Sequence, residues 1–511
     1  MYAKTKGLVL LGLQSEIVTV EVDIAAGLPC FEIVGLPTAA VREAKERVRA
    51  AIRNAGFEFP MRRIVINLAP ADIRKDGSGL DLAMAMGILL ASHVLKLKKT
   101  QQDMLANSSV FIGELSLEGY IKGVTGGLAM AMGARKKGIS TIYTTPSIGS
   151  EIKSGFGESV VIADTLHELV NMITGQMAIR LAEKATAVAE KIDLLPDFKE
   201  VQGQVIAKKA LEIAAAGGHH VLLSGSPGAG KTMLARSLPS ILPPLTEEEQ
   251  LIISQIYSVA GLLPHEGLMQ VRPFRSPHHT ITLAGMAGGG SVPKPGELTL
   301  SHGGVLFLDE APEFSRTVLE VLRQPLEEGV IHIARARGNY AFPCRFILLM
   351  AMNPCPCGWY NSKDGHVCTC TPWQRENYIR RLSGPLLDRI DMVIEVARPS
   401  YEEFCGQAVN ETSAVIRERV IQAREFQAWR MKQKGLCETL LNSELTHSQL
   451  LATCELTGMA ESMLAQVFQR LQVSIRSYDK ILRVARTIAD LKQSLTVEAD
   501  YVAEALSYRM N

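Results

Sequence analysis

A glycine-rich run of eight residues carries the clearest chemical signal in the sequence. It follows the short apolar stretch VLLS, precedes the helix start MLARSL, and matches the spacing G-x-x-x-x-G-K-[ST]. Glycines let successive backbone N–H groups point inward at phosphate oxygens, and a helix N-terminus adds partial positive charge. We expect the run to bind phosphate through Gly225, Ser226, Pro227, Gly228, Ala229, Gly230, Lys231 and Thr232.

The last two residues of this run have separate expected tasks. Lys231 can reach the β- and γ-phosphates of a nucleoside triphosphate, and the Thr232 hydroxyl is placed to bind Mg²⁺. The alternative is a glycine-rich turn that arose by chance. Because the strand, the lysine, the threonine and the helix are all in place, we prefer the phosphate-binding interpretation.

An acidic pair supports the same chemistry. The segment VLFLDE, residues 305–310, consists of four apolar residues followed by Asp309 and Glu310. A buried strand that ends in two acids is costly unless the acids have a task. We expect Asp309 to hold the Mg²⁺ shell and Glu310 to orient and polarise the attacking water. The alternative is a solvated acidic strand end, which would be preferred if the pair stood alone.

Three further polar residues could take part. Asn353 ends the apolar segment FILLMAMNP and either touches the γ-phosphate or the water, or simply forms an Asn-Pro turn. Arg389 lies just before an expected strand, and Arg476 lies at an expected helix start. Either arginine could stabilise transition-state charge as an arginine finger, and the ordinary alternative is a surface salt bridge.

The elements that must position these residues fall into successive regions. A chain of 511 residues suggests about three domains at ~150 residues each. The first region mixes strands with an amphipathic helix over 41–56 and a helix over 80–92 that is apolar all round. Later strands and helices alternate, which is typical of a parallel sheet covered by helices, before the pattern becomes helical throughout. The expected boundaries are 1–175, a linker at 176–195, then 196–400 and 401–511.

Composition limits the classes of partner. The 54 Lys and Arg residues against 53 Asp and Glu give a net charge of +1, which excludes a histone-like polycation and a disordered acidic chain. A local basic surface for nucleic acid stays possible. The sequence has no uncharged apolar run of 18 residues, so we expect no membrane span. The clustered cysteines and the lack of an export signal favour a reducing cytoplasm.

In combination, these motifs resemble AAA+ ATPases, and most closely the magnesium-chelatase-like branch with its ComM (YifB) family. The resemblance is carried by DFKEVQGQVIAKKALEIAAAGGHHVLLSG, FRSPHHTIT, GELTLSHGGVLFLDE, AMNPCPCG and RLSGPLLDRID. It implies an α/β fold with a P-loop AAA+ core and a helical lid. It also implies a ring, a hexamer by expectation, that binds ATP and Mg²⁺ at subunit interfaces.

The resemblance also implies residue roles. Five residues would act on the nucleotide bound by their own subunit: Lys231, Thr232, Asp309, Glu310 and Asn353. Arg389 would be a finger donated to the neighbouring subunit, with Arg380 and Arg381 as rivals, and Arg476 would be the sensor on the lid.

The N-terminal region resembles the proteolytic domain of Lon-type proteases, which has an S5-like α/β fold. The segments GELSLEGYIKGVTGGL and RKDGSG carry this resemblance. By position, the nucleophilic serine is replaced by Gly79, with Ser78 one place off, and the catalytic lysine is replaced by Ala131. Because a Ser-Lys dyad needs both groups, we predict that this domain is proteolytically inactive and acts as a scaffold.

A cysteine cluster suggests a second metal. Cys355, Cys357, Cys368 and Cys370 form C-x-C-x10-C-x-C in a loop-rich insert at 354–372. Four thiolates can bind structural Zn²⁺ in a closed tetrahedral site, and His366 is a possible substitute ligand. The alternative is a set of incidental thiols in a reducing compartment.

The substrate of the ATPase is less well marked. Residues 329–346 are expected to form a β-hairpin that carries Arg335 and Arg337 on one strand face, where they could track a phosphate backbone. The alternative is a charged, solvated edge strand. Arg275, beside His278 and His279, lies in another possible DNA-contacting loop; the two histidines could bind metal, but we prefer a structural or DNA-contact role.

Three functions follow from these patterns. The ComM (YifB) resemblance implies a motor on single-stranded or branched DNA that drives branch migration during natural transformation. A chelatase-type remodeller of a protein or metal-insertion partner is the second possibility, disfavoured because no integrin-like domain follows the lid. A Lon-like protease is the third, and the missing dyad argues against it.

Overall fold

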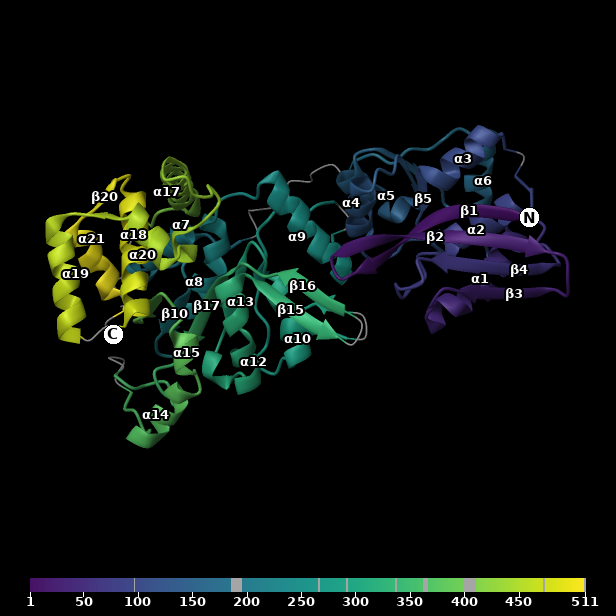
Figure 1. Ribbon diagram of the computed structural model, residues 1–511. Helices are drawn as coiled ribbons and strands as arrows, with labels where there is room; N and C mark the ends of the chain where they lie inside the picture. The colour runs from purple at the N-terminus through teal and green to yellow at the C-terminus, as the bar shows by residue number, and fades with distance from the viewer. Residues whose placement is uncertain are drawn as a thin grey trace. The chain divides into compact units, whose positions relative to one another are not determined.

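The computed structural model describes residues 1–95, 97–184, 195–264, 267–290, 293–335, 338–361, 366–398, 410–471 and 474–509 (Figure 1). The chain divides into two compact units. The N-terminal unit comprises Met1–Val188 and Glu247–Gln270, and the C-terminal unit comprises Ala189–Thr246 and Val271–Asn511. The N-terminal unit therefore includes a segment from within the range expected for the AAA+ core.

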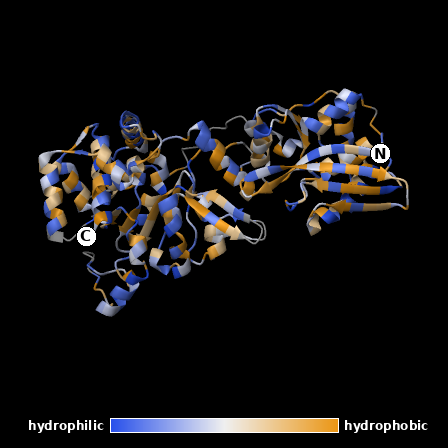
Figure 2. Cartoon of the chain, viewed as in Figure 1, coloured by the Kyte–Doolittle hydropathy of each residue, from blue (hydrophilic) through white to orange (hydrophobic). Residues whose placement is uncertain are grey.

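One sheet of the N-terminal unit has the strand order β1-β2-β4-β3. Buried and more exposed residues alternate along β2 and β4, as expected for strands with one face on a core (Figure 2). β3 pairs in parallel with β4, whereas the other neighbours are antiparallel. The four strands are β1 (Tyr2–Leu11), β2 (Gln14–Ala25), β3 (Cys30–Val34) and β4 (Arg63–Ala69).

Two helices beside this sheet match the sequence patterns. The buried residues of α1 (Ala39–Asn54) are Val41, Ala44, Val48, Ala51 and Ile52, the stripe predicted for an amphipathic helix. Every residue of α2 (Asp81–Ala91) is buried. Its one acid, Asp81, is paired with Arg47, whose Nε lies 2.8 Å from the carboxylate.

A second, parallel sheet of this unit has the order β5-β8-β9. Its strands are β5 (Ser109–Phe111), β8 (Thr141–Thr144) and β9 (Ser159–Ile162), and the helices of this region are α3 (Lys99–Asn107), α4 (Gly127–Lys136), α5 (Pro146–Phe156) and α6 (Leu166–Thr174). A short antiparallel pair, β6 (Glu114–Leu115) and β7 (Ile121–Lys122), precedes α4.

Helix α9 (Glu247–Ala260) belongs to the N-terminal unit although it lies far along the chain. The Ser258 carbonyl accepts a hydrogen bond from the Gly126 N–H at 3.0 Å. The Ser258 hydroxyl donates to Glu151 at 2.5 Å, and the Gln255 side chain donates to the Leu13 carbonyl at 2.6 Å. These bonds fix α9 against the start of α4 and the β1–β2 turn.

The C-terminal unit is built on a five-stranded parallel sheet with the order β11-β14-β17-β10-β18. Strands β14 and β17 are buried along their whole length, as is typical of a parallel sheet covered on both faces. This confirms the predicted α/β core. The strands are β10 (Val221–Ser224), β11 (Phe274–Arg275), β14 (Val305–Leu308), β17 (Ile347–Met352) and β18 (Met392–Glu395).

The C-terminal part of this unit is mainly helical. It contains α17 (Ser413–Gln433), α18 (His447–Thr453), α19 (Gly458–Leu471), α20 (Ile475–Leu491) and α21 (Ala499–Ser507), with one short pair of strands, β19 (Glu455–Leu456) and β20 (Thr496–Val497). Apolar side chains from α17, α20 and the sheet share one core, so the lid and the sheet are packed as one body.

Smaller elements surround the sheet. The predicted hairpin is present as β15 (Val330–Arg335) and β16 (Gly338–Pro343), with Arg335 opposite Gly338. Arg337 and the side chain of Arg335 lie outside the described residues. The remaining helices used below are α7 (Val205–Gly217), α8 (Lys231–Ser237), α10 (Leu283–Ala287), α12 (Arg316–Val321), α14 (Pro372–Arg380) and α15 (Gly384–Leu387). Among the described residues, no helix is both long and apolar enough to cross a membrane.

Candidate active site

The glycine-rich run forms a turn between β10 and α8. Gly228 and Gly230 have φ values of 76° and 87°, which favour glycine. Gly225 is required for a different reason, because a Cβ there would lie 2.3 Å from the Val396 carbonyl oxygen. The loop therefore curls tightly at the carboxyl end of β10, with the N-terminus of α8 directly behind it.

Lys231 lies at the centre of this turn. Its Nζ donates to the carbonyls of Gly225 and Ser226 at 2.7 and 3.0 Å, and to Asn353 Oδ1 at 3.1 Å. Burial lowers the pKa of Lys231, although the charges of Asp309 and Glu310 raise it. The ammonium group is thus held where a phosphate group on the turn would meet it, and it joins the turn to the end of β17.

Thr232 and Asp309 form an oxygen pair suited to a hard cation. The Thr232 hydroxyl donates to Asp309 Oδ2 at 2.9 Å, while Asp309 Oδ1 accepts from the Glu310 N–H at 3.0 Å. Hydroxyl and carboxylate oxygens are the ligands that Mg²⁺ prefers. The two residues come from adjacent elements, α8 and the end of β14, and fit the predicted Mg²⁺ position.

Glu310 faces outward from the same strand end. Its backbone is left-handed, with φ of 51°, and its side chain is 59% exposed. Its carboxylate lies 4.0 Å from His279 Nδ1, and the His279 ring packs against the His278 ring at 4.1 Å between centroids, tilted by 33°. The turn of the backbone directs Glu310 away from the Asp309 position, so that its carboxylate can meet a water molecule. Sequence reasoning placed His279 in a structural or DNA-contact role and missed its proximity to Glu310.

Asn353 is held from two sides. Its side chain binds Lys231, and its backbone forms a hydrogen bond with Tyr378 of α14. Burial raises the pKa of Tyr378 to about 12, despite the opposing effect of that hydrogen bond. Nothing in the sequence around Tyr378 marked it as a neighbour of the site.

The expected arginines are not gathered at this site. Arg389 forms an ion pair with Glu327 and donates to the Pro385 carbonyl at 2.6 Å, and its side chain is only 15% exposed. Arg381 pairs with Glu313 at 2.7 Å, and Arg380 pairs with Glu376 at 2.7 Å. Arg476 is exposed in the first turn of α20. None of the hydrogen bonds and ion pairs described for these four side chains involves the glycine-rich turn.

Comparison with known proteins identifies the family to which the chain is similar. Three family models match: "Magnesium chelatase, subunit ChlI" over residues 197–404, "Subunit ChlI of Mg-chelatase" over 20–146, and "Magnesium chelatase, subunit ChlI C-terminal" over 410–509. The chain is 41% identical to the uncharacterized protein YifB of Escherichia coli, over 98% of this chain and 95% of that protein. It is 40% identical to the competence protein ComM of Haemophilus influenzae, over 98% of this chain and 96% of that protein.

The chain belongs to the magnesium-chelatase-like AAA+ family of YifB and ComM. Membership implies an ATPase that uses ATP and Mg²⁺, in agreement with the turn, the Thr232–Asp309 pair and Glu310. A weaker similarity, 30% identity over 147 residues, links the N-terminal part of this AAA+ chain to Lon protease 2 of Bacillus subtilis; it covers 27% of the chain and 26% of that protease.

The Lon-like part of this AAA+ protein has no dyad at the expected positions. Ala131 is fully buried in the apolar core of α4, and the Ser78 hydroxyl donates to Glu114. A Cβ at Gly79 would meet only Val124, at 3.7 Å. The glycine is therefore not enforced by packing, and a serine side chain would fit.

The four cysteines of the insert lie together. Cys355 Sγ is 3.3 Å from Cys357 Sγ and 3.7 Å from Cys368 Sγ. The sulfur atoms of Cys357 and Cys368 are 3.6 Å apart. All four sulfur atoms, including that of Cys370, lie within 4.8 Å of one another. A hydrogen bond from the Trp359 backbone lowers the pKa of Cys357 to about 5. His366 packs on the Trp359 ring, at 4.2 Å between centroids, and is not part of the described ligand group.

A buried polar network joins the sheet to the lid. His219 contacts Asp391 through Nδ1 at 3.2 Å and Thr487 of α20 through Nε2 at 2.8 Å. Lys480 of the same helix donates to the carbonyls of Asp388 and Ile390, which flank Arg389. Burial raises the pKa of Asp391, but the bond to His219 and the nearby Lys480 ammonium outweigh burial and hold the pKa below its usual range, so the carboxylate stays charged. Sequence reasoning did not find this network, because its members are far apart along the chain.

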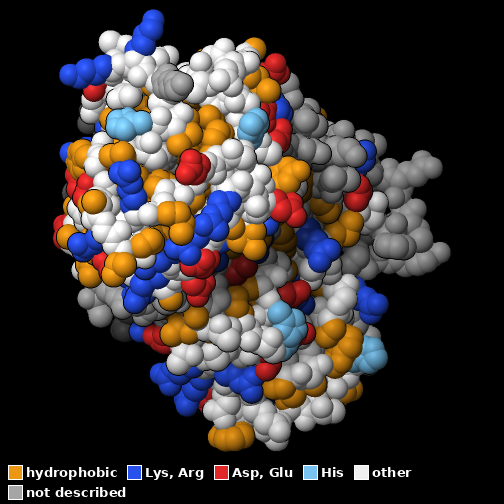
Figure 3. All heavy atoms as spheres, turned by 90° about the vertical axis from the view of Figure 1, so that its right-hand side faces the viewer, with side chains coloured by type: hydrophobic (Ala, Val, Ile, Leu, Met, Phe, Trp, Pro, Cys, Tyr) orange, Lys and Arg blue, Asp and Glu red, His pale blue; other side chains and the backbone are white. Residues whose placement is uncertain are grey.

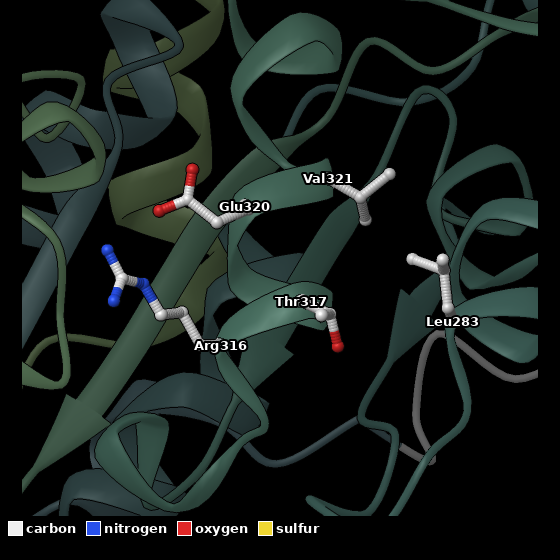
Figure 4. A pocket seen from close by; sticks show the side chains of 5 residues that line it. All are labelled: Leu283, Arg316, Thr317, Glu320 and Val321. Atoms are coloured by element: carbon white, nitrogen blue, oxygen red, sulfur yellow. The ribbon is translucent and has the colours of Figure 1, made fainter.

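A shallow depression lies apart from this chemistry. It is lined by Leu283 of α10 and by Arg316, Thr317, Glu320 and Val321 of α12 (Figure 4). Thr317 and Val321 point toward Leu283, whereas Arg316 and Glu320 project from another side of α12. None of the predicted ATP-binding residues lines it.

Proposed function

We propose that this chain is an ATP-driven ring motor that acts on DNA, as a branch-migration helicase in recombination and in the integration of DNA during natural transformation. The observation that carries the ATPase part is the meeting of Lys231, Thr232, Asp309 and Asn353 at the ends of three adjacent strands. The DNA part draws on the 40% identity to a protein named for competence.

In this proposal, each side chain acts on a different part of the nucleotide. Lys231 and the backbone N–H groups of the turn bind the phosphates and offset the charge that develops during transfer. Thr232 and Asp309 hold Mg²⁺, which when bound supplies further charge neutralisation between phosphate oxygens. Glu310 orients the attacking water and accepts its proton, and Asn353 positions that water or the γ-phosphate.

A ring, expected to be a homohexamer, completes the site in this proposal. Arg389 acts on the nucleotide of the neighbouring subunit, and Arg476 acts as a sensor from the first turn of α20. The support for a donation between subunits is that the contacts described for Arg389 are to Glu327 and Pro385 of its own chain, away from its own glycine-rich turn. Glu327 would hold the finger until the subunits meet.

The DNA-binding residues are assigned to the β15–β16 hairpin. Arg335 and Arg337 would track a phosphate backbone without reading sequence. Arg275 is a weaker candidate, because its Nε and Nη2 each donate to Glu297 at 2.7 Å and the ion pair offsets its charge. On the face seen in Figure 3, positive and negative side chains are interspersed over the described residues, so this face presents no broad basic surface.

Zn²⁺ is the proposed second metal. In a tetrahedral site with Zn–S bonds of about 2.3 Å, neighbouring sulfur atoms lie about 3.8 Å apart. The sulfur distances of 3.3, 3.6 and 3.7 Å approach that value. The cysteines described by the structure form no disulfide, in keeping with a proposed cytoplasmic location.

A chelatase-type remodeller is the second candidate function. The observation in its favour is that all three matching family models describe a magnesium chelatase subunit. In either function, we propose that the N-terminal unit is a proteolytically inactive scaffold, since Gly79 and Ala131 supply neither nucleophile nor base.

The two functions differ in their response to DNA. We expect single-stranded and forked DNA to raise the rate of ATP hydrolysis at low salt. The double variant Arg335→Ala/Arg337→Ala should lose this stimulation. A charge-matched control, Arg62→Ala/Arg63→Ala in the N-terminal unit, should retain it. The same hydrolysis rate with every DNA form would replace the motor with the remodeller.

A further inference from the structure

The two ends of the segment from Asn353 to Tyr378 lie next to each other. Asn353, at the end of β17, is followed directly by Cys355 and Cys357. Cys368 and Cys370 lead into α14, whose Tyr378 returns to the Asn353 backbone. The two cysteine pairs therefore lie on the outgoing and returning limbs of a single loop, and the sulfur cluster closes it.

Aromatic contacts brace the two limbs. Trp359 on the outgoing limb packs on His366, with ring centroids 4.2 Å apart. The guanidinium of Arg375 in α14 lies 4.0 Å from the Tyr360 ring centroid. These contacts place the limbs side by side, but each involves an exposed or half-exposed ring and is therefore weak. The sulfur cluster is the part of the loop that can supply a strong cross-link.

The loop also touches the glycine-rich turn. Gly358 adjoins Cys357 and has a φ of 84°. A Cβ at Gly358 would lie 2.6 Å from both Cγ and Cδ of Pro227, and 3.9 Å from Asn353 Cγ. The backbone of the loop is thus packed directly on the phosphate-binding turn, with no room for a side chain between them.

We propose that a metal ion held by Cys355, Cys357, Cys368 and Cys370 fixes both Asn353 and the Pro227 side of the glycine-rich turn, so that tight nucleotide binding requires the loaded cluster. The metal class is a thiophilic divalent ion, with Zn²⁺ as the resident species. The inference rests on the proposed zinc site. It goes beyond that proposal because it gives the zinc an effect on nucleotide binding, whereas a structural zinc would only hold its own loop rigid.

The physical reason is the absence of other ties. Among the described residues, Asn353 is held by Lys231 and Tyr378, and Pro227 is covered by Gly358. A bound ion would join all four sulfur atoms, which lie within 4.8 Å of one another, and without it this cross-link between the two limbs is lost, so that the limbs can separate. Spreading the limbs moves Gly358 off Pro227 and draws Tyr378 away from Asn353. The residues in the cluster are then positioning residues, and they do not touch the nucleotide.

The test measures metal content and nucleotide affinity separately on the full-length protein. Zinc is quantified by elemental analysis, and affinity is measured with a fluorescent ATP analogue and Mg²⁺. We expect Cys368→Ser to lose the zinc, about one ion per chain in the wild type, and to bind the analogue at least about tenfold more weakly. Cys437→Ser, which removes an exposed cysteine outside the cluster, should change neither.

A second variant tests the contact without touching the ligands. Gly358→Ala should keep its zinc and still bind the analogue several-fold more weakly, because the added Cβ collides with Pro227. Gly435→Ala is its matched control, since Gly435 also has a positive φ of 70° but no atom within 4 Å of the added Cβ. If Cys368→Ser fails to fold, the comparison of Gly358→Ala with Gly435→Ala still tests whether the loop controls nucleotide binding.

Each outcome bears on a different claim. If Cys368→Ser lacks zinc but binds the nucleotide as tightly as wild type, the coupling is wrong and the zinc site is still supported. Wild-type affinity in Gly358→Ala would contradict the coupling in the same way. Wild-type protein that contains no metal would overturn the zinc site and the coupling together. The proposed ATPase has its own test in Lys231→Ala, which does not depend on the cluster.

Discussion

The two units of this chain are both α/β, yet they differ in which side chains occupy the positions matched to catalytic residues. In the C-terminal unit, Lys231, Asp309 and Asn353 meet at the ends of adjacent strands. In the N-terminal unit, the positions matched to a protease dyad hold Gly79 and the buried Ala131. The second fold is maintained without the nucleophile and base of a Ser-Lys dyad, which illustrates that a fold and the chemistry placed on it can separate.

The largest effect should come from removing Lys231. We expect Lys231→Ala to abolish measurable ATP hydrolysis, because the phosphates lose their only buried positive side chain among the described residues of the turn. Steady-state phosphate release measures this. Ser78→Ala, the corresponding substitution in the N-terminal unit, should leave ATP hydrolysis unchanged. A matching loss in Ser78→Ala would show that the N-terminal unit still carries chemistry.

Arg389→Ala should reduce hydrolysis by about 10³-fold, the scale expected of an arginine finger. Mixed rings with Lys231→Ala subunits should recover part of the rate, because the two defects then fall on different sites. Glu327→Gln is the control: it removes the same ion pair but leaves the finger, so it should hydrolyse at or above the wild-type rate. Equal losses in both variants would mean that the Arg389–Glu327 pair is structural.

The stability of the C-terminal unit should fall in mild acid. His220 accepts a hydrogen bond from the Leu348 N–H at 3.1 Å, and burial lowers the pKa of His220 from 6.5 to about 4. Because the folded state needs neutral His220, this contribution is complete above pH 6.5 and is lost as pH falls toward 4. Urea unfolding at pH 7 and pH 4.5 should show a loss of about 2 kcal/mol from this residue.

The matching variant is His220→Gln, which keeps a polar acceptor that does not titrate. It should flatten the pH dependence between 6.5 and 4 relative to wild type. Unchanged pH dependence would assign the acid sensitivity to other groups. Unfolding of the N-terminal unit, monitored separately, should show no change on this substitution.

The smallest effect should come from restoring a serine in the N-terminal unit. Gly79→Ser should change the free energy of unfolding by less than about 0.5 kcal/mol, because the new Cβ meets only Val124 at 3.7 Å. Gly35→Ser is the contrast: it places a Cβ 2.2 Å from the Leu68 carbonyl at a φ of +97° and should destabilise strongly. Thermal denaturation compares the two. Neither should create protease activity, since Ala131 still provides no base.

Local patterns were sufficient to predict much of the fold. The apolar stripe of α1, the uniform burial of α2, and the runs of β14 and β17 follow from spacing over a few residues. The strand ends at Ser224, Asp309 and Asn353 lie at one edge of the sheet because β10, β14 and β17 are parallel neighbours. The parallel pairing brings together residues that are between 44 and 129 positions apart in the chain.

Other features depend on contacts that no local pattern encodes. Nothing in the composition of α9 indicates that it packs on α4, over 100 residues earlier. The contact between Gly358 and Pro227 and the bond between Tyr378 and Asn353 each arise from how a loop folds back in three dimensions. In the buried network, His219 and Asp391 lie just before β10 and β18 and Thr487 lies in α20, and no local pattern reveals that they are partners.

The division of the chain has a practical consequence for dissecting it. The backbone passes between the units three times, near residues 188, 246 and 270, so no single cut separates them. A fragment that starts after residue 195 would retain α9, with its buried Ile253, Ile256 and Tyr257, while discarding α4, on which α9 packs. Such a fragment would aggregate through this uncovered face, whereas one that also replaces residues 247–270 with a short polar connector should remain dispersed.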